Sequence, residues 1–331
     1  MSFNILSLSG GGYRGLFTIE VLARLERQAG KPIGQCFDLI AGTSIGGIIA
    51  IGLAMDKTAK EIRETFLEQG AAIFPKGEPA AGWIARKVAQ YKFYTGGPKY
   101  DGNALRATIE KIVGKDTLFG HAHTRLVVPA VNMTKGSVQI FKTPHSSGVV
   151  VDLHRKAADI AMATSAAPTF FPMAKIDNSY YADGGLVANS PDACALHEAV
   201  HFCDQRVSDI TLLSVGTTTT GFSLPASLGP DLGVVEWMKN ERLISTVMSS
   251  QQQIVDFMVE HQLHDRYLRI DARPSNEQIV DLGLDLATPA RRETLLGLAE
   301  GAYQRVAGSP FIERVLAHKR ANTDFPSLLS K

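Results

Sequence analysis

The chain has 331 residues, of which 45% are hydrophobic and 20% charged, a balance typical of a globular protein with a sizeable core. Its formal net charge of +1 argues against DNA or RNA binding through a broadly basic surface. The three cysteines follow no disulfide or metal-ligand spacing, and the first residues contain no secretory signal, so we expect a cytoplasmic protein without a metal site.

The first predicted strand, at 3–9, leads into a glycine-rich turn, Gly-Gly-Gly-Tyr-Arg-Gly at 10–15, and then into a helix. The spacing of the first, third and last glycines matches a dinucleotide-binding turn, but that class of site expects an acidic residue near the far end of the second strand. The nearby Asp38 lies at the start of that strand instead. We therefore favour a turn whose amides bind negative charge that develops on an oxygen.

The stretch 37–47 reads as an apolar strand that enters Gly-Thr-Ser-Ile-Gly and continues as an apolar helix to Met55. A serine between such a strand and helix occupies a strained turn that exposes its hydroxyl next to the helix N-terminus. Side chains at Gly42 or Gly46 would crowd the backbone where the chain reverses direction. Ser44 is therefore the candidate nucleophile.

A third glycine turn follows the strand that ends at Asp183 and contains Gly184 and Gly185. Because the ends of parallel strands meet at one edge of a sheet, we expect this turn, the first turn and Ser44 to lie together. Between Ser44 and the third turn, and shortly after it, the sequence predicts helices at 58–73, 103–113, 155–164 and 192–203, and strands at 125–132, 137–142 and 210–215.

The last third of the chain begins with a long loop at 216–233. After the loop, helices are predicted at 234–262, 289–306 and 311–318, with a strand at 267–271. We find no repeat or linker, so we predict one domain over 1–331. Its catalytic motifs lie within 3–190, and the C-terminal helices, 234–318, pack on the same core. The alternation of strands and helices predicts an α/β fold with a mostly parallel sheet.

The segment 74–100 differs in composition from the rest of the chain. Proline and glycine interrupt its first part, and 83–94 is basic and aromatic. Such a segment suits an anionic membrane surface, a lid over the serine or an amphipathic helix packed on the core. The region 237–242 also combines arginine with an aromatic side chain.

These motifs together resemble the patatin-like phospholipases and acyl hydrolases. The resemblance rests on 10–15, 42–46, 165–172 and 183–185, which follow one another in the family's order. It implies a three-layer α/β/α fold, with Ser44 as nucleophile and Asp183 as its base in a dyad without histidine. It also implies an oxyanion hole and supporting positions: the amides of Gly10, Gly11 and Gly12, and then Arg14, Gly15, Gly42, Gly46, Gly184 and Gly185. Gly185 replaces the alanine of many relatives, a minor departure that leaves the aspartate in place.

The opening 5–17 and the overall length are similar to a bacterial branch of the family, the phospholipase effectors of antiphage (CBASS) signalling. That resemblance implies a phospholipase of type A that is silent until a cyclic dinucleotide binds and that then acts on membrane phospholipids. The chemistry would need no cofactor, and the contact with the inner membrane would be peripheral. The protein could form a homo-oligomer, and no local motif identifies a nucleotide pocket.

Three alternatives compete with this interpretation. One is a constitutive lipase, and another is a non-enzymatic protein whose glycine turns bind a nucleotide. The third is a Ser-His-Asp hydrolase with His261 or His264 as its base. That fold usually places more strands before its nucleophile, and neither histidine follows a strand with a supporting motif.

Overall fold

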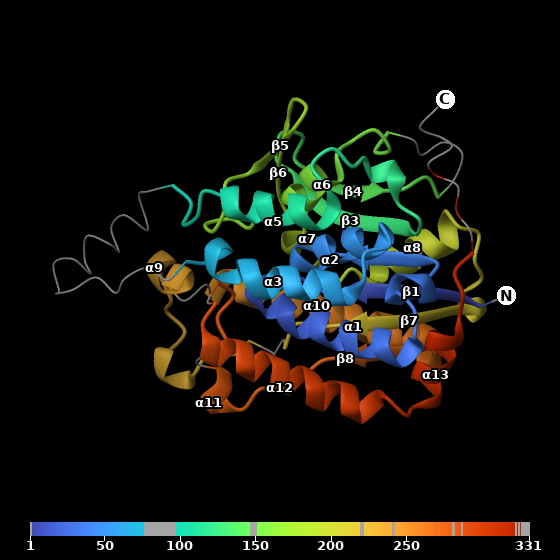
Figure 1. Cartoon of the computed structure of the whole chain (residues 1–331). Coiled ribbons are helices and arrows are strands. Elements are labelled where there is room, and N and C mark those ends of the chain that lie inside the picture. Colours follow the sequence, from blue (N-terminus) through green and yellow to red (C-terminus); the bar gives the residue numbers. More distant parts are fainter. Residues whose placement is uncertain are drawn as a thin grey trace.

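The structure is a computed structural model of the chain. It describes residues 2–75, 97–145, 151–218, 222–239, 242–279, 282–285, 287–321, 323 and 325. Helices lie on both sides of a central sheet, and the N-terminal strand runs through its middle (Figure 1). The basic, aromatic stretch 83–94 lies outside the described residues, as do two positions of 237–242.

The sheet has eight strands in the order β5-β6-β3-β2-β1-β7-β8, with β4 paired to β3 off this path. Neighbours run parallel from β3 to β8: β1 (Phe3–Leu8), β2 (Leu39–Gly42), β3 (Arg125–Asn132), β7 (Ile210–Val215) and β8 (Tyr267–Ile270). Antiparallel pairs involve the remaining three, β4 (Ser137–Lys142), β5 (Ala174–Ile176) and β6 (Ser179–Asp183). The prediction of a mostly parallel sheet is confirmed.

The central strands are buried on both faces, because their alternate side chains enter two separate apolar clusters. On β1, Leu6 and Leu8 face one cluster while Phe3 and Ile5 face the other. Helices of the first face are α1 (Gly15–Ala29), α2 (Ile45–Ala54), α3 (Ala59–Ile73), α5 (Asn103–Val113), α6 (Ala157–Thr164), α12 (Pro289–Val306) and α13 (Pro310–Ala317). The opposite face is covered by α8 (Asp192–His201) and α10 (Arg242–Leu263). The three-layer α/β/α fold is confirmed.

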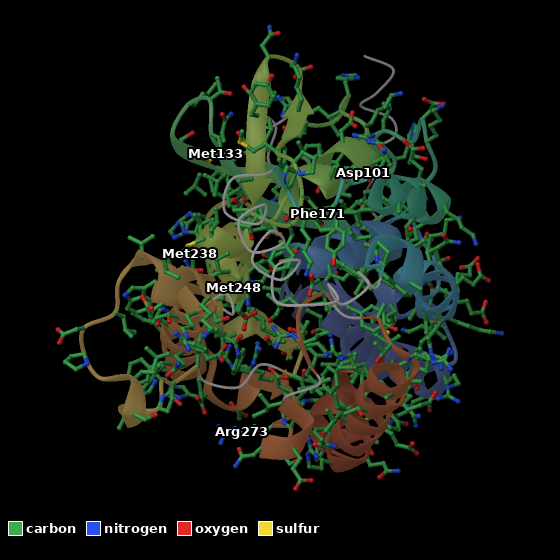
Figure 2. The ribbon with its side chains drawn as sticks, turned by 90° about the vertical axis from the view of Figure 1, so that its left-hand side faces the viewer. Asp101, Met133, Phe171, Met238, Met248 and Arg273 are labelled. Atoms are coloured by element: carbon green, nitrogen blue, oxygen red, sulfur yellow. The ribbon has the colours of Figure 1, made fainter. Side chains whose placement is uncertain are left out.

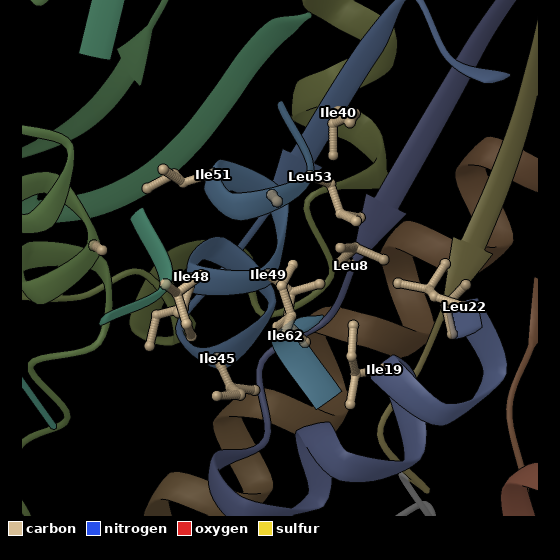
Figure 3. Close-up of a cluster of buried hydrophobic side chains, with 14 of the residues drawn as sticks. Leu8, Ile19, Leu22, Ile40, Ile45, Ile48, Ile49, Ile51, Leu53 and Ile62 are labelled. Atoms are coloured by element: carbon tan, nitrogen blue, oxygen red, sulfur yellow. The ribbon is translucent and has the colours of Figure 1, made fainter. Parts of the chain in front are cut away.

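The helix that follows Ser44, α2, is apolar and buried along its whole length. In Figure 3, Ile51 and Leu53 leave α2 in different directions, and Ile19 of α1 approaches from one side. The apolar run that includes α2 is therefore a core element between the sheet and other helices. Among the described helices, none is both long enough and apolar enough to cross a membrane.

Helix ends follow local signals in the sequence. Gly30 ends α1 in a left-handed conformation with φ 65°. Thr58 and Glu61 form the predicted capping box at the start of α3. The stretch 234–262, predicted to be largely helical, contains two helices among its described residues, α9 (Val234–Met238) and α10. Two further short helices are α7 (Gly185–Ala188) and α11 (Asn276–Ile279).

The C-terminal helices share a buried cluster with the N-terminal part of the chain. Leu295 of α12 and Ile312 of α13 are buried in the cluster that contains Leu6 of β1. This packing agrees with one domain over 1–331, which stays a prediction.

One edge of β3 is shared by β2 and β6. At Val127, β3 pairs with Ala41 of β2, and at Ala130 it pairs with Asp183 of β6. The other edge of β3 is occupied by β4, which pairs with it from Val127 to Asn132. β2 and β6 therefore share one edge of β3, and their carboxyl ends point toward each other. The gap between their carboxyl ends lies at Pro129, whose nitrogen has no hydrogen to donate to a strand.

This arrangement corrects one prediction. Asp183 does not end a strand parallel to its neighbour, because β6 is antiparallel to β3. It reaches Ser44 because the two strands point at each other across the gap in the β3 edge. Strand direction depends on pairing between distant segments, and the motifs around Asp183 do not encode it.

Candidate active site

Ser44 lies in a sharp turn between β2 and α2, with φ 54° and ψ −126°. That backbone conformation is strained for a residue with a side chain. The turn is tight enough that a Cβ on Gly42 would lie 2.2 Å from the carbonyl oxygen of Gly46, and a Cβ on Gly46 would lie 2.3 Å from that of Leu8. Both glycines are therefore required by the close approach of backbone, as the sequence predicted.

Ser44 and Asp183 are in direct contact. The hydroxyl of Ser44 donates a 2.7 Å hydrogen bond to Oδ2 of Asp183, and the amide of Gly185 donates a 2.6 Å bond to Oδ1. Asp183 is 5% exposed, and this burial raises the pKa of its carboxyl to about 6 against the opposing effect of those two bonds. The pair has the geometry of a hydroxyl held by a potential base.

The two candidate histidines lie elsewhere. His261 is exposed in the last turn of α10, where its ring contacts the carbonyl of Phe257 at 2.8 Å. His264 is exposed in the short turn after α10. In the part of the chain that the structure describes, no histidine lines the pocket around Ser44. The geometry gives no support to a Ser-His-Asp arrangement.

The first glycine turn lies beside this pair, as expected, and its three amides differ. The amide of Gly10 donates to the carbonyl of Asn189 at 2.9 Å and is therefore already engaged. Gly11 and Gly12 line the pocket together with Ser44, and their amides donate to no acceptor among the described residues. The amides of Gly11 and Gly12 are therefore the remaining candidate donors to an oxyanion. Gly10 instead packs against Ser44, since a Cβ on Gly10 would lie 3.2 Å from the Cβ of Ser44.

The supporting positions of the motifs are places of close packing. A Cβ on Gly15 would lie 2.3 Å from the side chain of Ile45, and one on Gly184 would lie 2.2 Å from the carbonyl oxygen of Pro129. The guanidinium of Arg14 donates to the carbonyl of Gly11 at 3.5 Å, so it braces the first turn. These contacts explain why small residues flank the reactive pair.

Ser44 and Asp183 open into an apolar pocket with a cavity volume of about 80 Å³. The stretch 165–172, one of the motifs on which the resemblance rests, contributes much of its wall, and α10 contributes Met248. Phe171 and Met248 lie near the centre of the same face in Figure 2. Asp285 also lines the pocket; it accepts a hydrogen bond from the hydroxyl of Tyr100 at 2.8 Å and pairs with Lys99.

Two threonines that the sequence did not single out hold the site together. The hydroxyl of Thr164 fills the gap beside β3, donating to the carbonyl of Pro129 at 2.6 Å and accepting from the amide of Ser44 at 3.1 Å. The hydroxyl of Thr217, just after β7, donates to the carbonyl of Gly10 at 2.9 Å. The sequence around each threonine does not indicate this role, because each one contacts a residue more than a hundred positions away.

A second polar cluster, partly buried, lies near the first glycine turn. Arg269 on β8 donates to Asp271 at 2.9 Å and to the hydroxyl of Ser214 at 2.8 Å, and it lies 3.5 Å from Asp256. The surrounding carboxylates raise the pKa of Arg269, although burial opposes them. Burial raises the pKa of Asp256 to about 6, which the charge of Arg269 only partly offsets.

Comparison with known proteins identifies the family to which this chain belongs. The model of the family "Patatin-like phospholipase" matches residues 6–192. A "cGAMP-activated phospholipase" of Pseudomonas aeruginosa is 37% identical over 96% of this chain and 93% of its own length. Proteins of the same name from Vibrio cholerae and Escherichia coli are 41% and 38% identical, each over 88% of this chain and over 87% and 86% of their own lengths. The chain belongs to the patatin-like phospholipase family.

Proposed function

We propose that this protein is a phospholipase of type A that hydrolyses acyl esters of membrane phospholipids, with Ser44 as nucleophile and Asp183 as general base. One observation carries the assignment of roles: the Ser44 hydroxyl donates a 2.7 Å hydrogen bond to a buried carboxylate within an apolar pocket. Membership of the family and the names of the three relatives support the lipid ester as substrate.

The reaction begins when Oγ of Ser44 attacks the ester carbonyl carbon and its proton passes to Oδ2 of Asp183. The carbonyl oxygen becomes an oxyanion, for which the amides of Gly11 and Gly12 are the available donors. As the ester C–O bond breaks, Asp183 returns the proton to the leaving lysophospholipid. Water then attacks the acyl-serine by the same route and releases a fatty acid.

The environment of Asp183 suits this work. A carboxylate is ordinarily a weak base, and proton transfer is most efficient when the pKa of the base lies near the working pH. Burial raises the pKa of Asp183 to about 6, so the group stays ionised at neutral pH and is a stronger base than an exposed carboxylate.

The pocket suits an acyl chain, because its lining is almost entirely apolar. Asp285 in its wall is held by an ion pair with Lys99 and by a hydrogen bond from the hydroxyl of Tyr100.

A cyclic dinucleotide is the proposed activator, because the three relatives are named as cGAMP-activated. Its phosphates require arginine or other donors and its bases require aromatic surfaces, but we assign no residues to this site. In this proposal the protein is an antiviral effector that works in the cytoplasm and contacts the inner membrane peripherally. A homo-oligomer and the absence of a required cofactor stay predictions.

The test is fatty acid release from phospholipid vesicles, with and without a panel of cyclic dinucleotides that includes cGAMP. We expect release by the wild type with one member of the panel and none by Ser44→Ala. Equal release without any nucleotide would identify a constitutive lipase. Absence of release, together with failure of a fluorophosphonate to label Ser44, would contradict a serine hydrolase altogether.

A further inference from the structure

The peptide unit between Gly10 and Gly11 is held from its carbonyl side by Thr217. Oγ1 of Thr217 donates a 2.9 Å hydrogen bond to the Gly10 carbonyl, and the threonine is 0% exposed. Because a trans peptide is planar, its C=O and the following N–H point in opposite directions. The bond therefore directs the Gly11 N–H away from Thr217, into the pocket that Gly11 lines with Ser44.

A second contact prevents rotation of this part of the turn. The amide of Gly10 donates to the carbonyl of Asn189 at 2.9 Å, so the backbone is tied on both sides of the Gly10 Cα. Gly11 itself rests on the threonine, since a Cβ there would lie 2.3 Å from Oγ1 of Thr217. Only glycine allows this approach, which places the hydroxyl directly behind the peptide that it orients.

Thr217 is in turn fixed by the partly buried charges near the first glycine turn. The amide of Gly216 donates to the carbonyl of Ile270 at 2.9 Å, and the amide of Thr218 donates to Asp271 at 2.8 Å. Asp271 is paired with Arg269 at 2.9 Å. The backbone on either side of Thr217 is thus anchored to the end of β8, which limits the positions available to its hydroxyl.

We propose that Thr217 is a positioning residue for the oxyanion hole: its hydroxyl fixes the Gly10–Gly11 peptide so that the Gly11 amide donates to the oxygen of the tetrahedral intermediate. The inference rests on the proposed function, because it needs an oxyanion to stabilise. A donor aimed at charge that develops during the reaction acts on kcat and leaves substrate binding nearly unchanged.

The test compares Thr217→Val, which keeps the side-chain shape without the donor, with Thr217→Ser, which keeps the hydroxyl. With 4-nitrophenyl butyrate as substrate, and with the cyclic dinucleotide that activates the wild type present at saturation, Thr217→Val should lower kcat by about 10- to 100-fold, somewhat less than complete loss of an oxyanion donor. KM should stay within about 3-fold, because ground-state binding does not use the amide. Thr217→Ser should restore most of kcat.

Thr65→Val is the matched control. Thr65 on α3 is 9% exposed, and its hydroxyl likewise donates to a backbone carbonyl, that of Glu61, at 3.0 Å. No described residue of α3 lines the pocket. This variant undergoes the same chemical change away from the site and should keep the wild-type kcat. If Thr217→Val fails to fold, Thr217→Ala supplies a second protein without the hydroxyl.

A trifluoromethyl ketone gives a readout that a purely structural role would not move, because addition of the serine creates an oxyanion. Its inhibition constant should rise in Thr217→Val by the factor by which kcat/KM falls. The inference is overturned if Thr217→Val matches Thr65→Val in both measurements, or if Thr217→Ser is as impaired as Thr217→Val. A wild type that neither cleaves the ester nor labels with a fluorophosphonate, even with the panel of cyclic dinucleotides present, would instead contradict the proposed function.

Discussion

Two polar clusters, one buried around Asp183 and one partly buried around Arg269, lie near the first glycine turn, and they are built in opposite ways. In the first cluster, Asp183 accepts hydrogen bonds from Ser44 and Gly185, and no cation is among its described contacts. In the second cluster, Arg269 lies between Asp271 and Asp256 and forms ion pairs with both.

The difference follows from what each carboxylate has to do. Burial raises the pKa of both Asp183 and Asp256 to about 6, although the charge of Arg269 partly offsets the rise at Asp256. The two carboxylates differ in their surroundings: Asp183 accepts a hydrogen bond from Ser44 at the pocket, whereas Asp256 lies 3.5 Å from the guanidinium of Arg269. Asp271 takes no part in the proposed chemistry; it is paired with Arg269 and binds backbone amides. The same residue type thus serves as a base or as scaffold according to its neighbours.

The largest expected effect is the loss of either member of the pair. Ser44→Ala and Asp183→Asn should each reduce ester hydrolysis by about 10⁴-fold or more, because residues that act as a unit fail together. His261→Ala and His264→Ala serve as controls, and both should retain activity close to that of the wild type. A large loss in either histidine variant would contradict a dyad of Ser44 and Asp183 that works without histidine.

Removal of the cation from the second cluster should act on stability. Arg269→Leu leaves Asp271 and Asp256 partly buried without their partner, which should cost about 2–3 kcal/mol of unfolding free energy. The measurement is urea denaturation at pH 7. Arg273→Leu, at an exposed arginine on the same segment, should change stability by less than about 0.5 kcal/mol. Similar values for the two variants would mean that Arg269 is not the centre of the cluster.

The raised pKa of Asp183 predicts opposite pH dependences for stability and activity. Folded Asp183 releases its proton near pH 6 and the unfolded residue near about pH 4, so the folded state binds more protons between these values. Stability contributed by this group is therefore lost as pH rises from about 4 to 6. Activity should rise over the upper part of the same range, with a midpoint near pH 6, because the base must be ionised.

Asp183→Asn isolates this effect. A difference of about 2 in pKa corresponds to about 3 kcal/mol, so the variant should be more stable than the wild type by up to that amount at pH 7. The advantage should fade as pH falls from about 6 to about 4 and vanish below about pH 3, where wild-type Asp183 is protonated in both states. Thermal or urea unfolding across this pH range gives the comparison, and a constant difference would contradict the assignment of the raised pKa to Asp183.

The smallest predicted effect concerns the neutral hydrogen bonds of the first cluster. Thr164→Val removes the hydroxyl that joins Pro129 to Ser44, which should cost about 2 kcal/mol and lower kcat about 10-fold. Thr164→Ser keeps the hydroxyl and should recover most of both. If Thr164→Val unfolds and turns over substrate like the wild type, the hydrogen bonds of the Thr164 hydroxyl to Pro129 and Ser44 contribute neither to stability nor to catalysis.

The sequence determined the parts of the site that are local. The strained turn at Ser44 requires Gly42 and Gly46, and apolar spacing with glycine and capping signals sets the helices around it. These features depend on backbone conformation and on residues a few positions apart, so they can be read in order along the chain. They were sufficient to predict Ser44 as the nucleophile and an α/β fold, whereas the resemblance to the patatin-like family implied Asp183 as its base.

Tertiary structure decided how these parts meet. The antiparallel direction of β6, the gap at Pro129 and the engagement of the Gly10 amide all result from pairing between distant segments. Thr217 contacts a residue 207 positions away, and nothing in its own surroundings marks it. Register and long-range hydrogen bonds follow from the packing of the whole sheet, where each contact depends on many others and none is encoded by a local pattern.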